Sequence, residues 1–233
     1  MARPDNIVIL TGAGISADSG VATFRGPDGL WEGHRVEDVA TPKAYARDPA
    51  LVHAFYDARR AALDRVAPNP AHLALARLDA AWDGDLLIVT QNVDDLHERA
   101  GAKRLSHMHG ALRLGWCLAC DAHFDWTGPM GELASCPACK VGGAVRPDIV
   151  WFGEMPYEMD SIDTAIARAD LFVSIGTSGA VYPAAGFVQT ARYHGAATLE
   201  INLEPSQGSL LFGERRFGRA AELVPAWVVE LLG

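Results

Sequence analysis

The sequence contains very little lysine. Of its 20 basic residues 17 are arginines, and only Lys43, Lys103 and Lys140 are lysines. Acidic residues number 29, so the formal net charge at pH 7 is −9. Proteins that coat nucleic acids neutralise phosphates with a basic face, and this charge balance argues against direct nucleic-acid binding. The scarcity of lysine itself indicates no function.

Long apolar segments are also missing, and we expect no leader sequence. No stretch reaches 18 uncharged apolar residues, and the N-terminus lacks a basic segment ahead of an apolar one. We therefore expect no membrane contact and a cytoplasmic location. The 233 residues, 49% of them hydrophobic, are enough for a full core in one domain or in one large and one small lobe.

Short apolar runs alternate with helical patterns along the chain. Runs rich in β-branched residues or leucine, without alternation, indicate parallel strands buried on both faces; they are Asn6–Leu10, Leu86–Thr90, Leu171–Ile175 and Thr198–Asn202. Between them, an N-cap residue followed by proline marks helix starts at Thr41-Pro42, Asp48-Pro49 and Asn69-Pro70. The sequence therefore predicts an α/β fold, a Rossmann-like and mostly parallel sheet with helices on both faces.

Small or polar residues follow each predicted strand. They are Thr11 to Ser16, Gln91 to Asp94, Gly176 to Ser178, and Asn202 to Glu204. The carboxyl ends of parallel strands share one edge of the sheet, where ligands bind. Each cluster alone is equally well explained by the turns that strand ends need, but four in phase favour a ligand site. The pair Gly12 and Gly14 would also let the backbone approach a pyrophosphate.

The four cysteines form two pairs with zinc-ligand spacing. Fifteen residues separate the two C-x₂-C pairs, Cys117 with Cys120 and Cys136 with Cys139. This spacing predicts one tetrahedral Zn²⁺, and four thiolates leave no open position, so the ion would be structural. The alternative is two structural thiol pairs or a redox C-x₂-C motif.

Seven motifs in order resemble the sirtuins, the NAD-dependent protein lysine deacylases: GAGISADSG, TFRGPDGLW, TQNVDDLH, HMHG, PDIVWFGE, GTSGAVYPA and INLEP. The resemblance extends from about residue 6 to residue 225. It implies a single catalytic domain, with a large Rossmann-like lobe formed by about 1–33, 70–112 and 148–233. The small lobe would combine a helical insertion, about 34–69, with a zinc-ribbon module, about 113–147.

The resemblance also assigns site residues. His109, followed by Gly110, would be the general base, with His107 as a structural neighbour on the same face of an extended segment. In sirtuins the acyl oxygen attacks the nicotinamide ribose, nicotinamide leaves, and a ribose hydroxyl deprotonated by the base attacks the imidate; imidazole titrates in the right range. The cofactor residues would be Gly12, Ala13, Gly14, Ile15, Ser16, Phe24, Arg25, Trp31, Gln91, Asn92, Val93, Asp94, Gly176, Thr177, Ser178, Asn202, Leu203, Glu204 and Ala220.

Substrate contacts follow from two further motifs. Tyr56 and Arg59 lie one helical turn apart and resemble the Y-x-x-R signature of sirtuins that remove succinyl or malonyl groups. From spacing alone, an amphipathic tyrosine and an arginine at the helix rim explain the pair better. Val150, Phe152 and Gly153 would receive an acylated peptide by strand addition, which depends little on peptide sequence.

The leading hypothesis is thus an NAD-consuming protein-lysine deacylase that takes acetyl and also succinyl or malonyl groups, with one structural Zn²⁺. A mono-ADP-ribosyltransferase would share the cofactor motifs. A non-enzymatic NAD-binding regulator would not need His109, Asn92 and Asp94 together. A dehydrogenase is disfavoured because residue 17 is alanine, which breaks the G-x-G-x-x-G pattern. We expect acylated-lysine proteins as partners and a monomeric enzyme.

Overall fold

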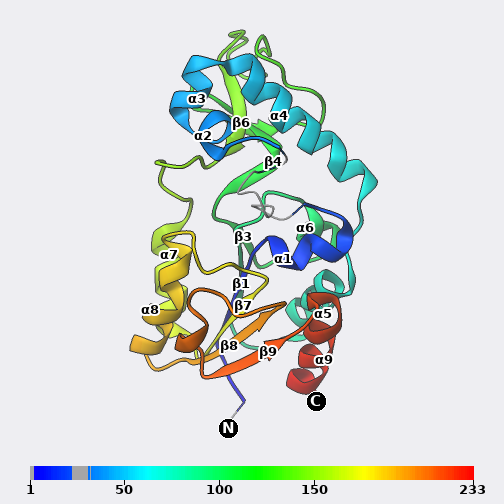
Figure 1. The fold of residues 1–233 in the computed structure, drawn as a ribbon, viewed down its shortest axis with the longest axis vertical. Helices are drawn as coiled ribbons and strands as arrows, with labels where there is room; N and C mark the ends of the chain where they lie inside the picture. Colours follow the sequence, from blue (N-terminus) through cyan, green and yellow to red (C-terminus); the bar gives the residue numbers. More distant parts are fainter. Residues whose placement is uncertain (1–2, 23–30, 32) are drawn as a thin grey trace.

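The computed structural model describes residues 3–22, 31 and 33–233. Its main element is a six-stranded sheet with the order β3-β2-β1-β7-β8-β9, in which all neighbours are parallel (Figure 1). The strands are β1 Ile7–Thr11, β2 Leu86–Thr90, β3 Leu105–His107, β7 Leu171–Ile175, β8 Ala197–Asn202 and β9 Glu214–Phe217. The predicted parallel sheet is confirmed.

The predicted strand bounds are close to the observed ones. The second and third predicted strands coincide with β2 and β7. Strand β1 both starts and ends one residue later than predicted, and β8 starts one residue earlier. The sequence patterns did not indicate β3 or β9. Strand β3 has only three residues, too few for a pattern. Strand β9 has the sequence Glu-Arg-Arg-Phe and lies at the edge of the sheet, where charged side chains can remain exposed to solvent.

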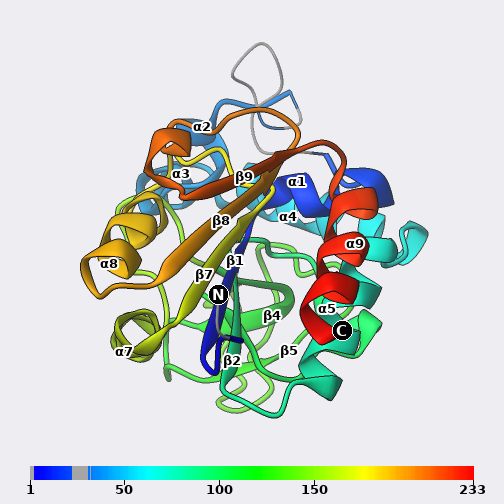
Figure 2. The ribbon, with the colours of Figure 1, turned by 90° about the horizontal axis from the view of Figure 1, so that it is seen from below.

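Helices cover both faces of this sheet, as predicted. In β1, Ile7 and Ile9 belong to the core on one face, and Val8 and Leu10 to the core on the other. Figure 2 shows the two layers on opposite sides of the sheet. One layer contains α5 Pro70–Ala81 and α9 Ala220–Leu232, and the other contains α7 Met159–Arg168 and α8 Phe187–Tyr193. Strand β1 is therefore buried along its whole length.

The three predicted helix starts are confirmed by their caps. The side chains of Thr41, Asp48 and Asn69 accept hydrogen bonds from main-chain amides of the first turn, at 3.0, 3.0 and 2.9 Å. The helices that begin there are α3 Pro42–Arg47, α4 Pro49–Ala62 and α5. The α-helical part of α4 ends at Ala62, and the 3₁₀ turn η2 Leu63–Arg65 continues it.

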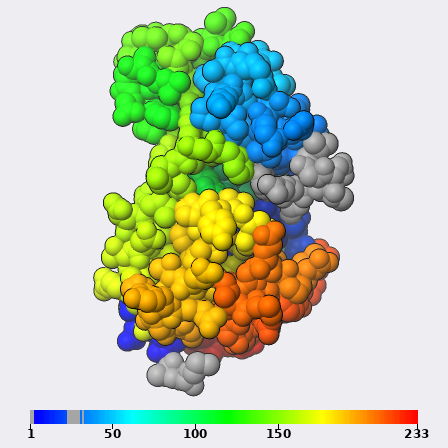
Figure 3. Space-filling model, turned by 60° about the vertical axis from the view of Figure 1, so that its left-hand side comes forward, coloured from blue at the N-terminus to red at the C-terminus, as the bar shows by residue number. Residues whose placement is uncertain are grey.

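A second, antiparallel sheet lies above the first in Figure 1 and has the order β5-β4-β6. Its strands are β4 Gly110–Cys117, β5 His123–Asp125 and β6 Val145–Ile149. Helices α2 Val36–Val39, α3 and α4 share a core with it that includes Tyr56, Leu112 and Trp151. Figure 3 shows the two parts of the molecule joined by a narrower middle region.

The remaining elements are short. They are α1 Ala13–Ser16, α6 Leu96–Ala100, and the 3₁₀ turns η1 Ala17–Ser19, η3 Ala184–Gly186 and η4 Ser209–Leu211. Both chain ends lie on the side of the six-stranded sheet (Figure 1). Among the described residues, none of the helices has the length and apolar character needed to span a bilayer.

Candidate active site

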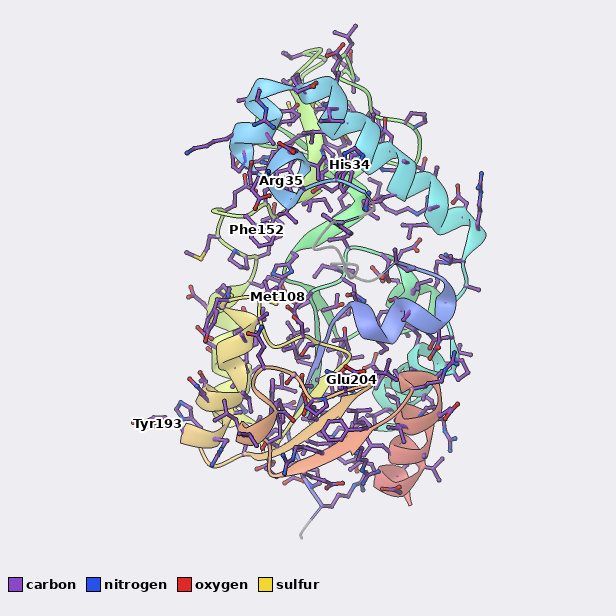
Figure 4. All side chains as sticks on the ribbon, in the orientation of Figure 1. His34, Arg35, Met108, Phe152, Tyr193 and Glu204 are labelled. Atoms are coloured by element: carbon purple, nitrogen blue, oxygen red, sulfur yellow. The ribbon has the colours of Figure 1, made fainter. Side chains whose placement is uncertain are left out.

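A cavity of about 700 Å³ opens where the carboxyl ends of β1, β2, β7 and β8 face the three-stranded sheet. In Figure 4, Phe152 lies on the side of the three-stranded sheet and Glu204 on the side of the six-stranded sheet, so the cavity wall draws on both. The predicted residues that line it are Gly12, Ala13, Gly14, Trp31, Tyr56, Arg59, Gln91, Asn92, Val93, Asp94, His109, Val150, Phe152, Gly153, Gly176, Thr177, Ser178, Asn202, Leu203, Glu204 and Ala220.

Two predicted cofactor residues that the structure describes do not line the cavity. Ile15 and Ser16 are fully buried. Phe24 and Arg25 lie outside the described residues. Residues that line the cavity and were not predicted include Asp18, Leu63, Leu112, Trp151, Tyr182 and Arg219.

The loops after β1 and β7 touch each other at the base of the cavity. The amide of Gly14 donates to the carbonyl oxygen of Gly176 at 2.8 Å, and a Cβ atom on Gly14 would lie 2.7 Å from the Gly176 Cα. Gly176 itself has φ of +65°, a conformation open to glycine. From β1 the chain builds the sheet outward through β2 and β3 on one side, and through β7, β8 and β9 on the other. In parallel sheets the switch point between two such halves is where a nucleotide binds.

A buried hydrogen-bond network lies beneath these loops. The Ser16 hydroxyl donates to a carboxylate oxygen of Asp94 at 2.9 Å and accepts from the Asn92 side-chain amide at 3.1 Å. The His72 Nδ1 accepts from the Asn69 amide, so its Nε2 carries the proton and faces the Ser16 hydroxyl at 3.4 Å. Ser16 thus holds Asn92 and Asp94 in place from below the cavity.

Burial shapes the charges of this network. It raises the pKa of Asp94 above its usual range, while hydrogen bonds from Leu96 and Ser16 favour the carboxylate. Burial also lowers the pKa of His72 to about 4, so its ring is neutral at pH 7. His72 was not predicted; its three-residue spacing from the N-cap Asn69 was the available signal, and it completes a capping box there.

His109 faces the cavity with one ring nitrogen anchored. Its Nδ1 lies 3.1 Å from the main-chain carbonyl oxygen of Gln91, the first residue after β2. A carbonyl can only accept, so Nδ1 carries the proton and Nε2 keeps its lone pair. Burial lowers the pKa of His109, and the hydrogen bond to Gln91 works against this. The neutral ring can therefore accept a proton on Nε2.

His107 does not share an extended face with His109, so this prediction is wrong. Strand β3 ends at His107, and Met108 and His109 form a turn before Gly110, which has φ of +75°. The two ring nitrogens of His107 bond to the Asn92 carbonyl at 3.2 Å and to Glu98 at 2.7 Å. Burial opposes the charge of His107, but the contacts with Glu98 outweigh it and raise its pKa. The residue is a structural neighbour, as predicted.

Tyr56 and Arg59 lie on the cavity face of α4. Tyr56 is fully buried, and its hydroxyl accepts from the Trp151 indole N–H at 3.0 Å. The Arg59 guanidinium stacks on Phe55 and Trp31, with its Cζ 3.6 and 4.4 Å from the ring centroids. Both residues therefore line the cavity and are surrounded by aromatic side chains.

The four cysteines converge as the spacing predicts. All four Sγ atoms lie within 4.8 Å of one another, and none of the four cysteines is in a disulfide. Two of the Sγ···Sγ distances, Cys117 to Cys139 and Cys120 to Cys136, are 3.7 Å. A tetrahedral Zn²⁺ with bonds of about 2.3 Å separates its sulfur ligands by about 3.8 Å. The cysteines are therefore positioned to bind one structural zinc ion.

Comparison with known proteins gives a consistent result. The Sir2 family profile matches residues 12–183. The NAD-dependent protein deacylase of Pasteurella multocida strain Pm70 is 55% identical over 234 residues, covering 100% of both chains. A crystal structure of a Sir2 homolog–NAD complex superposes with a TM-score of 0.91 at 38% identity, covering 100% of this chain and 92% of that one.

A second solved structure contains a peptide. A complex titled Sir2-p53 peptide-NAD+ superposes with a TM-score of 0.82 at 26% identity, covering 97% of this chain and 93% of that one. The fold of this chain agrees with both solved structures over nearly its whole length. The chain belongs to the Sir2 family.

Proposed function

We propose that the protein is an NAD-dependent protein-lysine deacylase, which releases nicotinamide and forms O-acyl-ADP-ribose. The observation that carries this proposal is His109, whose unprotonated Nε2 belongs to the same cavity as the glycine loops of the switch point. Relatives at 53–57% identity are named NAD-dependent protein deacylases. Each of these covers nearly the whole of this chain.

In this proposal NAD lies across the switch point. The main chain of Gly12 and Gly14 approaches the pyrophosphate, because no side chain keeps it away. The Asn202 side-chain amide donates to the Thr177 carbonyl at 2.7 Å, which holds the loops after β7 and β8 together on the adenosine side. Asn92 and Asp94 lie toward the nicotinamide ribose, where Asp94 accepts from the carboxamide.

His109 acts as the general base. The acyl oxygen of the modified lysine attacks the ribose as nicotinamide leaves, and the resulting imidate is attacked by a ribose hydroxyl. Water then adds to this adduct and releases free lysine and O-acyl-ADP-ribose. The hydroxyl is a weak nucleophile at pH 7, and Nε2 of the neutral His109 ring takes its proton. The Nδ1–H bond to Gln91 supports this role, because it fixes the ring orientation and stays in place when the ring is protonated.

The acyl group lies against α4. The guanidinium of Arg59 and the hydroxyl of Tyr56 line the same wall, and together they suit the distal carboxylate of a succinyl or malonyl group. Trp31 lines the same wall and accepts the apolar part of the acyl group. Acetyl-lysine fits the same site without using Arg59.

The substrate peptide adds as a strand beside residues 150–153, the segment that follows β6. The amide of Val150 donates to the His109 carbonyl at 2.9 Å, which places this segment next to the base. Because strand addition uses main-chain hydrogen bonds, the enzyme should accept acylated-lysine peptides with little preference for the residues around the lysine.

The two lobes divide the chain as the family resemblance implies, with the large lobe at 1–33, 70–112 and 148–233. The small lobe would then be 34–69 and 113–147. Strands β4 and β6 cross the proposed boundaries, so the three-stranded sheet joins the lobes at the cavity.

Product analysis tests the proposal. Matched acetyl-lysine and succinyl-lysine peptides are incubated with NAD, and peptide and nucleotide products are identified by mass spectrometry. We expect free lysine, nicotinamide and O-acyl-ADP-ribose in equal amounts, formed only when the acyl peptide is present. ADP-ribose attached to the peptide, without loss of the acyl group, would instead establish a mono-ADP-ribosyltransferase.

A further inference from the structure

The hydrogen bond between Trp151 and Tyr56 constrains the only polar atom that Tyr56 offers to the cavity. The indole N–H of Trp151 lies 3.0 Å from the Tyr56 hydroxyl oxygen. An indole nitrogen donates and never accepts, so the hydroxyl is the acceptor in this bond. The hydroxyl hydrogen must then turn away from Trp151 and is left to donate elsewhere.

Trp151 is itself held rigidly. It is 2% exposed, and its main-chain amide donates to the Glu154 carboxylate at 2.8 Å. The Arg146 guanidinium lies over its ring, with Cζ 3.3 Å from the centroid, and forms two hydrogen bonds to the same carboxylate at 2.6 and 3.0 Å. The Tyr45 ring contacts it as well, at 5.2 Å between centroids. The indole N–H therefore has a fixed direction.

From this geometry we infer that Trp151 determines specificity for acidic acyl groups by aiming the Tyr56 hydroxyl as a donor toward the acyl carboxylate. The inference deepens the proposed function and rests on it. Trp151 is a positioning residue, because it acts through Tyr56. A neutral acetyl group has no distal carboxylate, so its removal does not depend on where the Tyr56 hydrogen points.

The Tyr56 environment suits a donor. Burial raises the pKa of the Tyr56 phenol, so the hydroxyl keeps its hydrogen at neutral pH. Within the described residues, the bond from Trp151 is the one hydrogen bond of this hydroxyl. The hydrogen is thus available to a ligand that carries an acceptor, and a carboxylate is the strongest such acceptor.

The test compares kcat and KM for acetyl and succinyl peptides of one sequence. In Trp151→Phe the ring remains and the N–H is lost. We expect KM for the succinyl peptide to rise about fivefold more than KM for the acetyl peptide, the loss typical of one neutral hydrogen bond. Trp82→Phe is the matched control, because Trp82 is also buried and donates to a main-chain carbonyl, that of Asp5, outside the cavity. It should leave the ratio of the two activities unchanged.

A double-mutant cycle separates positioning from simple packing. Tyr56→Phe should lower the succinyl preference, and adding Trp151→Phe in that background should cause no further change in preference. If Trp151→Phe does not fold, replacing Trp151 by 3-benzothienylalanine keeps the shape and removes only the N–H. Equal losses on both peptides, or full additivity with Tyr56→Phe, would overturn the inference. Absence of any NAD-dependent deacylation by the unaltered enzyme would instead overturn the proposed function.

Discussion

The Nδ1 atom of His109 lies 3.1 Å from the main-chain carbonyl oxygen of Gln91, at the end of the central part of the parallel sheet. This bond assigns the ring proton to Nδ1 and leaves Nε2 as an acceptor. It also links the proposed base to a rigid element, since the Gln91 amide donates to the Thr11 carbonyl at 2.9 Å. A general base on such a support loses little entropy when it reacts.

The first prediction concerns pH. His109 must be neutral to accept a proton, and burial holds its pKa below 6.5. Because the base is inactivated by protonation, activity is retained above this pKa and lost as pH falls through it. We therefore expect the acidic limb of log kcat/KM against pH, which reports the free enzyme, to have its midpoint below 6.5. A midpoint above 6.5 would show that a different group is the base.

Arg59→Met gives the second prediction. The substitution keeps the length of an apolar side chain and removes the charge that would pair with an acyl carboxylate. We expect desuccinylation to lose about 2–5 kcal/mol of transition-state stabilisation, while deacetylation changes far less. Steady-state kinetics on matched peptides measures both. Equal losses would mean that Arg59 stabilises the aromatic wall and does not read the acyl group.

The third prediction concerns stability in acid. Burial lowers the pKa of His72 to about 4 and that of His97 to about 3, against 6.5 in the unfolded chain. As pH falls below 6.5 the unfolded state binds protons that the folded state excludes, so stability present at pH 7 is lost toward pH 4. Between pH 7 and pH 5, each of these two histidines should lower the free energy of unfolding by about 2 kcal/mol.

Urea denaturation at several pH values measures this effect. A His97→Asn variant carries one buried imidazole fewer and should lose less stability between pH 7 and pH 5 than the parent protein does. The same loss in parent and variant would contradict the account.

Zinc removal gives the fourth prediction. The core around Cys117 and Cys136 has only two other buried hydrophobic residues among those described, Met130 and Val145. So small a core supplies little folding energy, and four thiolates on Zn²⁺ would supply the rest. We expect one zinc per chain by elemental analysis, and we expect Cys136→Ser to lose the metal and lower Tm. A metal-free variant with unchanged Tm would refute the structural role.

Much of the fold could be predicted because it depends on local patterns. The buried runs of β2 and β7 and the caps at Thr41, Asp48 and Asn69 are signals within a few residues. Edge strand β9 could not be predicted, because its pairing with β8 is long-range and its residues are mostly charged.

The site divides in the same way. The glycine loops and cysteine pairs are contiguous motifs, and the structure brings each to one place. The contacts of Ser16 with His72 and of Tyr56 with Trp151 join residues 56 and 95 positions apart, and no periodicity reports them. The turn between His107 and His109 did have a signal, because Gly110 follows it directly. A Cβ atom on Gly110 would lie 2.0 Å from the Asp148 carbonyl oxygen.

The most direct test of the account measures NAD affinity and acyl-peptide turnover in His109→Ala. The NAD contacts that we propose on the glycine loops do not involve the imidazole, so calorimetry should give an affinity within a few-fold of the parent value. Deacylation, followed by mass spectrometry, should fall by about 10²–10⁴ because the ribose hydroxyl loses its base. Turnover of His109→Ala near the parent rate would contradict the central claim.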